Sequence, residues 1–243
     1  MGRLRQLADS TGARGRSLVA VVAGSGLVAR CAVEAGADLL MVLSAGLYRN
    51  LGTGSLAAFL PYGNANDQTE MLLREHILPR AQRVPVIAGV YAADETCPLE
   101  SRLRRLQSLG VEGVVNWPAV GLIDGGYREA IEAEGLGTHC EAAMLSLAKS
   151  AGFVTFGFAL TKEEVTCFVN AGVDGLILDL GLTRKVDDIR EKRDQLQRAI
   201  VRLNEMLKAA SEGAAGRLCL AFGGPITTPE DLEEVYRYTT VHG

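Results

Sequence analysis

One local pattern repeats along the whole chain of 243 residues. A short apolar run leads into a turn containing Gly or Asp, and a segment with apolar residues at helical spacing follows. The apolar runs are continuous rather than alternating, which is typical of parallel strands covered on both faces. They occupy residues 17–23, 37–43, 84–91, 111–116, 152–158, 173–180 and 216–222. Strands that alternate with helices indicate βαβ units in one parallel sheet.

The helical segments carry recognisable start signals. Thr161 stands three residues before Glu164, which is the spacing of a capping box. Thr228 is a candidate capping residue. It is followed by Pro229 in the first turn of the helix and by the early acid Asp231. The longest helical pattern covers residues 187–210 and keeps its apolar residues on one face.

Seven such strands in a chain of this length predict a single α/β domain over residues 1–243, folded as a TIM (β/α)8-type barrel rather than an open doubly wound sheet. An eighth strand would begin near Thr239, and the sequence stops at Gly243. We therefore expect a barrel that lacks its eighth strand or is truncated there. The first and last strands would then each have an edge with unpaired backbone groups, which proteins normally cover. The domain is then C-terminally incomplete, part of a longer polypeptide, or completed by a partner chain.

Composition excludes several classes of function. The net charge is −4, and no Lys and Arg cluster is interleaved with aromatics, so we expect no nucleic-acid partner. The N-terminal arginines at positions 3, 5, 14 and 16 are dispersed and fit a solvated surface. The five cysteines are far apart and form no CxxC pair, which predicts reduced thiols and a cytoplasmic protein. No signal peptide or apolar span is visible, so we expect no membrane partner. We do expect the protein to form a homo-oligomer.

In a TIM barrel, the loops that follow the strands carry the functional residues. The first such turn holds Gly24 and Ser25, whose amides would bind an anion or simply form a packing turn. Residues 44–68 follow the second strand and are too long for an ordinary linker, so we expect an ordered lid over the barrel mouth. Arg49 in this lid is the first cation suited to a carboxylate or phosphate, although a surface role competes.

Four polar residues follow later strands. Asp94 is predicted to bind Mg²⁺, to act as a base or to cap the next helix, and Asn116 to donate to a substrate carbonyl. Glu141 is a reactive carboxylate or a first-turn acid. Asp179 ends a strongly apolar run, so we expect a perturbed pKa and a role in the site. The alternative is a buried structural hydrogen-bond acceptor. His139 is the one histidine near a strand-end face, which gives little support to a His-based triad.

The seventh strand leads into Gly223 and Gly224 and then into a helix start at Thr228. Two glycines let a backbone approach a ligand, and helix amides attract anions, so this turn is the strongest predicted anion site. A phosphate or a carboxylate would fit it.

Four segments form a more specific pattern. Residues 52–57 are Gly-Thr-Gly-Ser-Leu-Ala, and residues 60–66 are Leu-Pro-Tyr-Gly-Asn-Ala-Asn. Residues 116–125 are Asn-Trp-Pro-Ala-Val-Gly-Leu-Ile-Asp-Gly, and residues 223–231 are Gly-Gly-Pro-Ile-Thr-Thr-Pro-Glu-Asp. Over nearly the whole chain, this pattern resembles the phosphoenolpyruvate hydrolase-like family of TIM-barrel proteins. The family is also described as signal-transduction proteins and forms the C-terminal domain of tobamovirus-resistance-like proteins.

The resemblance implies a lyase or hydrolase for a small anionic 2-oxo acid or a phosphoenolpyruvate-like substrate. It also implies Mg²⁺, which would stabilise a developing enolate as a Lewis acid. Arg49 and the turn at residues 223–224 would hold the anionic end. Asp94, Glu141 and Asp179 are then the predicted catalytic residues, with Asp94 as the metal ligand. The predicted substrate-binding residues are Gly24, Ser25, Ser44, Tyr48, Arg49, Tyr62, Asn64, Asn116, Gly223 and Gly224.

The sequence also departs from the family pattern. Leu47 stands where the family has an Arg, and Asp179 stands where it tends to have a His. Residues 184–187 replace a Gly-rich loop. These changes favour an alternative from another class, a binding or regulatory barrel that keeps the anion pocket without turnover. Retention of Arg49, Asp94, Asn116 and Glu141 favours the enzyme.

Overall fold

The computed structural model describes residues 7, 17–183, 186–212 and 217–243. The four N-terminal arginines, Gly216 and residues 184–185 lie outside this part of the chain. The elements in chain order are β1 (Ala20–Val22), α2 (Gly26–Glu34), β2 (Leu39–Val42), α3 (Ser44–Asn50), η2 (Ser55–Phe59), α4 (Ala65–Met71), η3 (Leu72–Ile77), α5 (Leu78–Ala81), β3 (Val86–Val90), α6 (Leu99–Ser108), β4 (Gly113–Asn116), η4 (Val120–Leu122), α7 (Gly125–Ala133), α8 (Thr138–Ser150), β5 (Val154–Ala159), α9 (Lys162–Asn170), β6 (Gly175–Asp179), α10 (Ile189–Ser211), β7 (Leu218–Phe222) and α11 (Pro229–Tyr238). No helix in the described ranges combines the length and the apolar character needed to cross a membrane.

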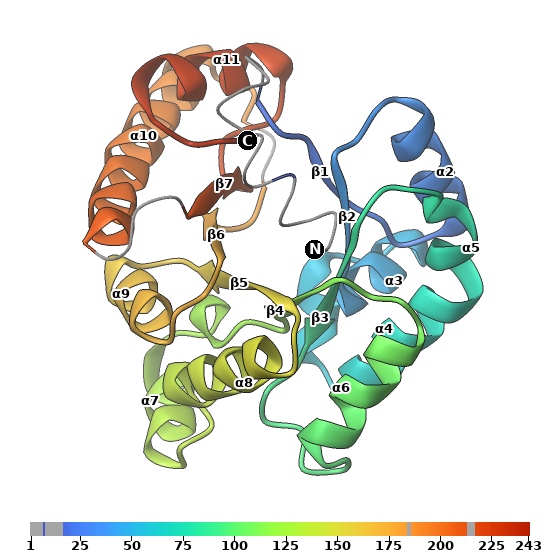
Figure 1. The fold of residues 1–243 in the computed structure, drawn as a ribbon. Helices are drawn as coiled ribbons and strands as arrows, with labels where there is room; N and C mark the ends of the chain where they lie inside the picture. The colour runs from blue at the N-terminus through green and yellow to red at the C-terminus, as the bar shows by residue number, and fades with distance from the viewer. Residues whose placement is uncertain (1–6, 8–16, 184–185, 213–216) are drawn as a thin grey trace.

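The seven predicted strands are confirmed as one parallel sheet. Their order in the sheet is β1 to β7, so each strand pairs with the next strand along the chain. Figure 1 shows the sheet curled into an arc with the helices on its outer side. All residues of β2, β3, β4, β5 and β6 are buried, which explains why their sequences are continuous apolar runs.

Alternate strand residues enter two separate cores. In β2, Leu40 and Val42 pack against the surrounding helices. Leu39 and Met41 point to the other face and join a core enclosed by the sheet. The same alternation places Phe156 and Phe158 of β5 inside the sheet's curve. An enclosed core of this kind requires a curled sheet, as in a TIM barrel.

The end of the chain lies between the first and last strands. Leu18, just before β1, donates its backbone N–H to the carbonyl of His242 at 2.7 Å. On the other side, His242 donates to Cys219 of β7, and Ala221 donates to Gly243, both at 2.8 Å. These residues form no eighth strand, as expected, but their backbone bridges β1 and β7 at the position where an eighth strand would lie.

The helix starts follow the predicted signals with one difference. Thr228 and Asp231 form a complete capping box at the start of α11. Thr161 accepts from the N–H of Glu164 at 3.2 Å. The carboxylate of Glu164, however, accepts from the N–H of Leu160 at 2.7 Å rather than from Thr161, so this capping box is only half formed.

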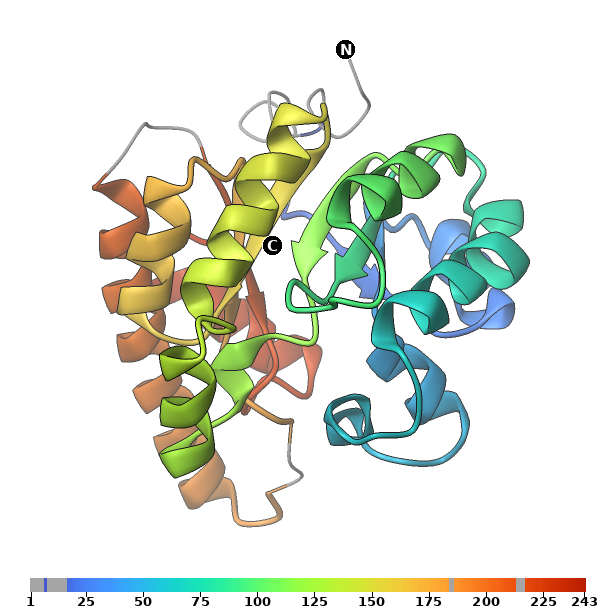
Figure 2. The ribbon, with the colours of Figure 1, turned by 90° about the horizontal axis from the view of Figure 1, so that it is seen from below.

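The predicted lid is ordered and lies at the end of the sheet where the strands terminate. It forms α3 and η2, which Figure 2 shows together on one side of the molecule. Gly24 positions this lid, because a Cβ on Gly24 would overlap the carbonyl oxygen of Gly46 in α3. The turn after β1 and the start of α3 therefore pack backbone to backbone.

This contact leads to a stability prediction. Gly24→Ala should destabilise the protein by about 1–3 kcal/mol, because an added methyl must separate two backbone segments. Gly126→Ala is the matched control, since a Cβ there meets no atom within 4 Å. Urea unfolding of both variants would measure the difference. Equal unfolding midpoints for the two variants would contradict the packing role.

Candidate functional site

A cavity of about 620 Å³ opens at the ends of the strands, and we call it the barrel-mouth cavity. Its walls come from the ends of β2, β4, β6 and β7 and from the lid. It is lined by Leu43, Arg49, Thr53, Gly54, Ser55, Leu56, Trp117, Leu122, Asp179, Gly181, Leu182, Thr183 and Phe222. Two of the predicted site residues, Arg49 and Asp179, meet in this cavity.

Arg49 lies in the last turn of α3 and has no anionic partner in the part of the chain that the structure describes. Its guanidinium donates to the hydroxyl of Ser55 at 3.1 Å and forms no ion pair with any described residue. Partial burial lowers the pKa of Arg49, because its charge is only partly hydrated. Arg49 is exposed at the cavity, and a guanidinium that pairs with no carboxylate among the described residues is suited to bind an anion through two parallel hydrogen bonds.

Asp179 is the last residue of β6 and is only 2% exposed. Its pKa is raised to about 6, mainly by burial and to a lesser extent by the charge of Glu164, while the N–H of Gly181 and the charge of Arg202 act in the opposite direction. The Gly181 N–H donates to Oδ1 at 3.0 Å. Asp179 can therefore gain or lose a proton near neutral pH, as predicted from its place in an apolar strand.

Gly223 leaves room for this carboxylate. Its φ is +73°, and a Cβ there would overlap the Gly181 carbonyl and lie 2.7 Å from Oδ1 of Asp179. The amide of Gly224 donates to Gly181 at 2.7 Å, and the amides of Thr227 and Thr228 donate to Asp231. These groups already have acceptors, so the predicted anion-binding role of this turn stays a prediction.

Two buried polar groups beside the cavity lack partners. The indole N–H of Trp117 has no acceptor, and the hydroxyl of Ser44 has no partner, among the described residues. A buried donor without an acceptor carries a free-energy cost of about 1–3 kcal/mol. Trp117 was not among the predicted site residues, although its place directly after β4 is a usable signal in the sequence. Thr53, Ser55 and Thr183 also line the cavity without having been predicted as site residues.

Asp94 lies outside the barrel-mouth cavity. It lines a second cavity of about 700 Å³, between the lid, the loop after β3 and α7. Its Oδ2 accepts from Asn64, Asn66 and Arg102, each at 2.9 Å, while Oδ1 accepts from the N–H and hydroxyl of Thr96. Burial alone would raise the pKa of Asp94, but the bonds from Thr96 and the two asparagines hold it well below its usual range.

This arrangement does not fit a divalent metal. Both oxygens of Asp94 are occupied by five donors, and a carboxylate offers about four lone-pair sites. Within the described ranges, no three His, Cys, Asp or Glu side chains are grouped so that they could hold a metal ion. Mg²⁺ binding at Asp94 would have to displace at least one existing donor, so it stays a prediction.

Asn116 and Glu141 form a closed pair behind the cavity. The Asn116 amide donates to Glu141 Oε2 at 2.9 Å and is bonded in both directions to the backbone of Phe158. Glu141 Oε1 accepts from the N–H of Val120 at 2.8 Å. Burial raises the pKa of Glu141 to about 8. Both side chains are buried and line none of the cavities described here, and the pair connects β4, β5 and α8.

The other predicted binding residues have local partners. The hydroxyl of Ser25 caps α2, and Asn64 caps α4 while contacting Asp94. Tyr48 is buried with its hydroxyl bonded to Gln68 at 2.7 Å. Tyr62 is 65% exposed and packs its ring 5.9 Å from that of Tyr48. None of these four side chains lines the barrel-mouth cavity.

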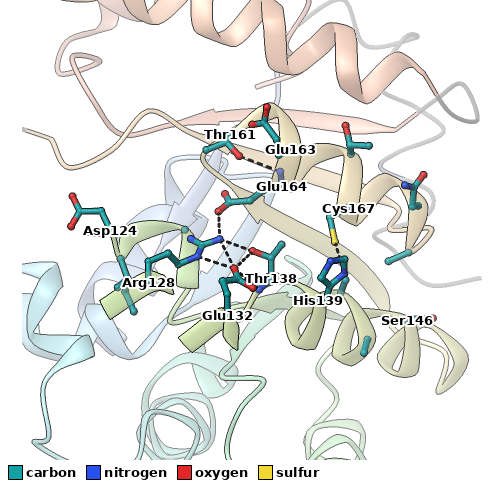
Figure 3. Close-up of a pocket in the computed structure, with 17 residues that line it drawn as sticks. Asp124, Arg128, Glu132, Thr138, His139, Ser146, Thr161, Glu163, Glu164 and Cys167 are labelled. Atoms are coloured by element: carbon teal, nitrogen blue, oxygen red, sulfur yellow. Dashed lines mark hydrogen bonds and ion pairs between the residues drawn. The ribbon is translucent and has the colours of Figure 1, made fainter. Parts of the chain in front are cut away.

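A third cavity of about 1030 Å³ lies between α7, α8 and α9. Figure 3 shows Arg128 at its centre, directed at Glu132 and Glu164. Although this groove is larger than the barrel mouth, its cation is already neutralised by two carboxylates. Nδ1 of His139 lies 3.7 Å from Sγ of Cys167, but burial and the neighbouring acids raise the pKa of this thiol. A raised pKa disfavours the thiolate form that a Cys–His nucleophile uses.

Comparison with known proteins places this fold and cavity in a family. The family model described as "Phosphoenolpyruvate hydrolase-like" matches residues 4–243. The tomato (Solanum lycopersicum) ToMV resistance protein Tm-1(GCR237) is 32% identical over 241 residues, which are 99% of this chain and 32% of that protein. The chain thus spans about a third of the length of this curated relative.

Two solved structures share the fold at low identity. Phosphoenolpyruvate phosphomutase from Streptomyces platensis subsp. rosaceus superposes with a TM-score of 0.57 at 16% identity, covering 98% of this chain and 84% of that one. A phosphonopyruvate hydrolase in complex with oxalate and Mg²⁺ superposes with a TM-score of 0.56 at 15% identity, covering 100% and 79%. The family match over nearly the full length settles the classification: the chain belongs to the phosphoenolpyruvate hydrolase-like family.

Proposed function

We propose that the barrel mouth binds the carboxylate of a 2-oxo acid and that the protein is a lyase or hydrolase acting beside the 2-oxo group. One observation carries the proposal. Arg49, a cation with no anionic partner among the described residues, lines the same cavity as Asp179, a carboxyl group whose pKa of about 6 allows proton transfer near neutral pH.

The comparisons support this chemistry by analogy. The family is named for phosphoenolpyruvate hydrolysis, and one protein of similar fold was solved with oxalate, a small carboxylate. Because the chain spans about a third of its tomato relative, the activity and partners of that whole protein are separate questions. Self-association and a cytoplasmic location also stay predictions for this chain.

Each residue then has a defined task. The Arg49 fork holds the substrate carboxylate, and Ser55 orients the fork. In an aldol-type cleavage, the leaving fragment departs as a carbonyl compound and its hydroxyl proton passes to solvent. The bonding electron pair stays on the carbon next to the 2-oxo group as an enolate. Asp179 donates its proton to that carbon, and the enolate becomes a 2-oxo acid.

No step in this scheme passes through a metal, because the donor set at Asp94 does not fit one. If Mg²⁺ binds, it supplies Lewis-acid stabilisation of the enolate, as the resemblance implies.

A second candidate function is an anion-binding barrel without turnover. The closed Asn116–Glu141 pair and the fully bonded Asp94 favour it, because three residues expected to support catalysis lie away from Arg49. The two candidates share the carboxylate site and differ in whether Asp179 exchanges a proton with the ligand.

The shared carboxylate site can be tested directly. Arg49→Met should raise the Kd for oxalate and pyruvate by about 10- to 100-fold, because hydrogen bonds to charged groups contribute about 1.5–3 kcal/mol. Ser55→Ala is the matched control, since it removes the partner of Arg49 and keeps the charge. Isothermal calorimetry and ligand-dependent shifts of the melting temperature would measure both variants.

The control separates charge from local structure. Ser55→Ala should weaken binding much less than Arg49→Met does. If Arg49→Met binds these acids as tightly as the unmodified protein, the carboxylate site at the barrel mouth is refuted.

A further inference from the structure

The barrel-mouth cavity is large for the smallest 2-oxo acids. Its volume is about 620 Å³. A three-carbon acid such as pyruvate fills roughly 100 Å³. This is the volume of three to four water molecules in the liquid, at about 30 Å³ each. Pyruvate would therefore leave most of the cavity to water. Cavities of about 300–1,000 Å³ normally enclose larger organic ligands.

The walls of the cavity are mainly apolar. Leucines and aromatic rings surround the two charged residues, and three hydroxyl groups supply the other polar side chains. Leu56 and Leu182 are 47% and 37% exposed, so each presents apolar surface that a ligand would cover. The apolar lining residues are Leu43, Leu56, Trp117, Leu122, Leu182 and Phe222.

Aromatic contacts fix two of these walls in place. Trp117 packs edge to face on Phe59 and Phe158, with ring centroids 5.8 Å and 5.1 Å apart. Phe158 in turn packs on Phe222 at 5.6 Å. The rings of Trp117 and Phe222 are thus held from behind, and another ring between them would find partners in the same geometry.

The charged residues of the cavity limit how many negative charges the ligand can carry. Among the described lining residues, Arg49 is the one cation and Asp179 the one acid. One guanidinium matches one carboxylate in a bidentate pair. A phosphate monoester that also carries a carboxylate brings about one and a half to two further negative charges at pH 7, for which the described lining offers no second cation.

We infer that the ligand of the barrel mouth is a 2-oxo monocarboxylate with a bulky apolar substituent of aryl size, rather than pyruvate or phosphoenolpyruvate. This inference rests on the proposed function, because it places the carboxylate on Arg49 and the 2-oxo group beside Asp179. The substituent then lies against Trp117, Phe222 and the exposed leucines.

A comparison of four probes on the full chain tests the inference. Phenylpyruvate carries both features, pyruvate and phosphoenolpyruvate lack the ring, and 2-phenylethanol lacks the carboxylate. Calorimetry should give a Kd for phenylpyruvate at least tenfold below that of each other probe. The double substitution Leu56→Ala and Leu182→Ala should remove most of that advantage, measured as the ratio of the Kd values for pyruvate and phenylpyruvate.

Leu60→Ala is the matched control. Leu60 belongs to the same lid and is 50% exposed, but it lines the neighbouring cavity instead. Its truncation should leave the Kd for phenylpyruvate unchanged.

Each adverse outcome points to a different failure. If pyruvate or phosphoenolpyruvate binds as tightly as phenylpyruvate, the apolar substituent is refuted while the carboxylate site stands. Equal binding of 2-phenylethanol overturns the requirement for a carboxylate. If none of the carboxylates binds, the proposed function itself fails.

Discussion

Asp179→Asn should abolish proton exchange at the carbon next to the 2-oxo group. In D₂O, the unmodified protein is expected to replace the C3 protons of phenylpyruvate with deuterium, because Asp179 removes a proton to form the enolate and returns a deuteron. The exchange rate measured by NMR should fall by about 100- to 10,000-fold in the variant. Ligand binding should change little, since Arg49 holds the carboxylate.

The pH profile identifies the group responsible. Removal of the proton requires the carboxylate form of Asp179, so the exchange rate should rise with pH up to about 6 and then level off. The exchange rate of the Asp179→Asn variant should show no such rise with pH. Asp174→Asn is the control, because Asp174 precedes the same strand at its opposite end and pairs with Lys149. Exchange that persists in Asp179→Asn with the same pH profile would refute the role of Asp179, and exchange by the unmodified protein no faster than in its absence would favour the anion-binding barrel without turnover.

Glu141 should make the protein less stable as the pH rises. Its pKa lies near 8 in the folded state, against an ordinary value of 4.5, because burial opposes its charge. Between these values the folded state binds more protons than the unfolded state does. The free energy of unfolding should therefore fall by up to about 1.4 kcal/mol for each pH unit in this interval.

Glu141→Gln removes the titration and keeps an oxygen that can accept from Val120. Urea unfolding at pH 6, 7 and 8 should show a falling stability for the unmodified protein and a flatter profile for the variant. Other titrating groups are common to both proteins, so they cancel in the difference between the profiles. Parallel profiles would show that Glu141 does not carry the pH dependence.

Much of the fold could be predicted because its causes are local. Strands such as β3 and β5 are buried on both faces, so their apolar runs are continuous and stand out between glycine-bearing turns. The cap at Thr228 depends only on residues within one helical turn, and it forms as expected. The direction taken by the Glu164 side chain depends on the packing of the loop before α9, and there the local rule was only half right.

The site was harder to predict because strand ends look alike in sequence. Asp94 and Asp179 are both acids at the ends of strands, but their surroundings differ. Arg102 and two asparagines from the lid surround Asp94, while Asp179 faces a cavity and meets few donors. Those neighbours come from distant parts of the chain, so residue type and local spacing do not distinguish a fully bonded acid from a titrating one.

The position of the chain's end between β1 and β7 has a consequence for the order of assembly. Every strand from β1 to β7 pairs with its neighbour in sequence, so the sheet can grow one βα unit at a time with modest loop-closure entropy. The bond between Leu18 and His242 spans almost the whole chain, whereas the bonds of His242 to Cys219 and of Ala221 to Gly243 are local in sequence. Pairing between neighbouring strands is therefore expected to form more readily than the contact of Leu18 with His242, because the loop that this contact closes is far longer.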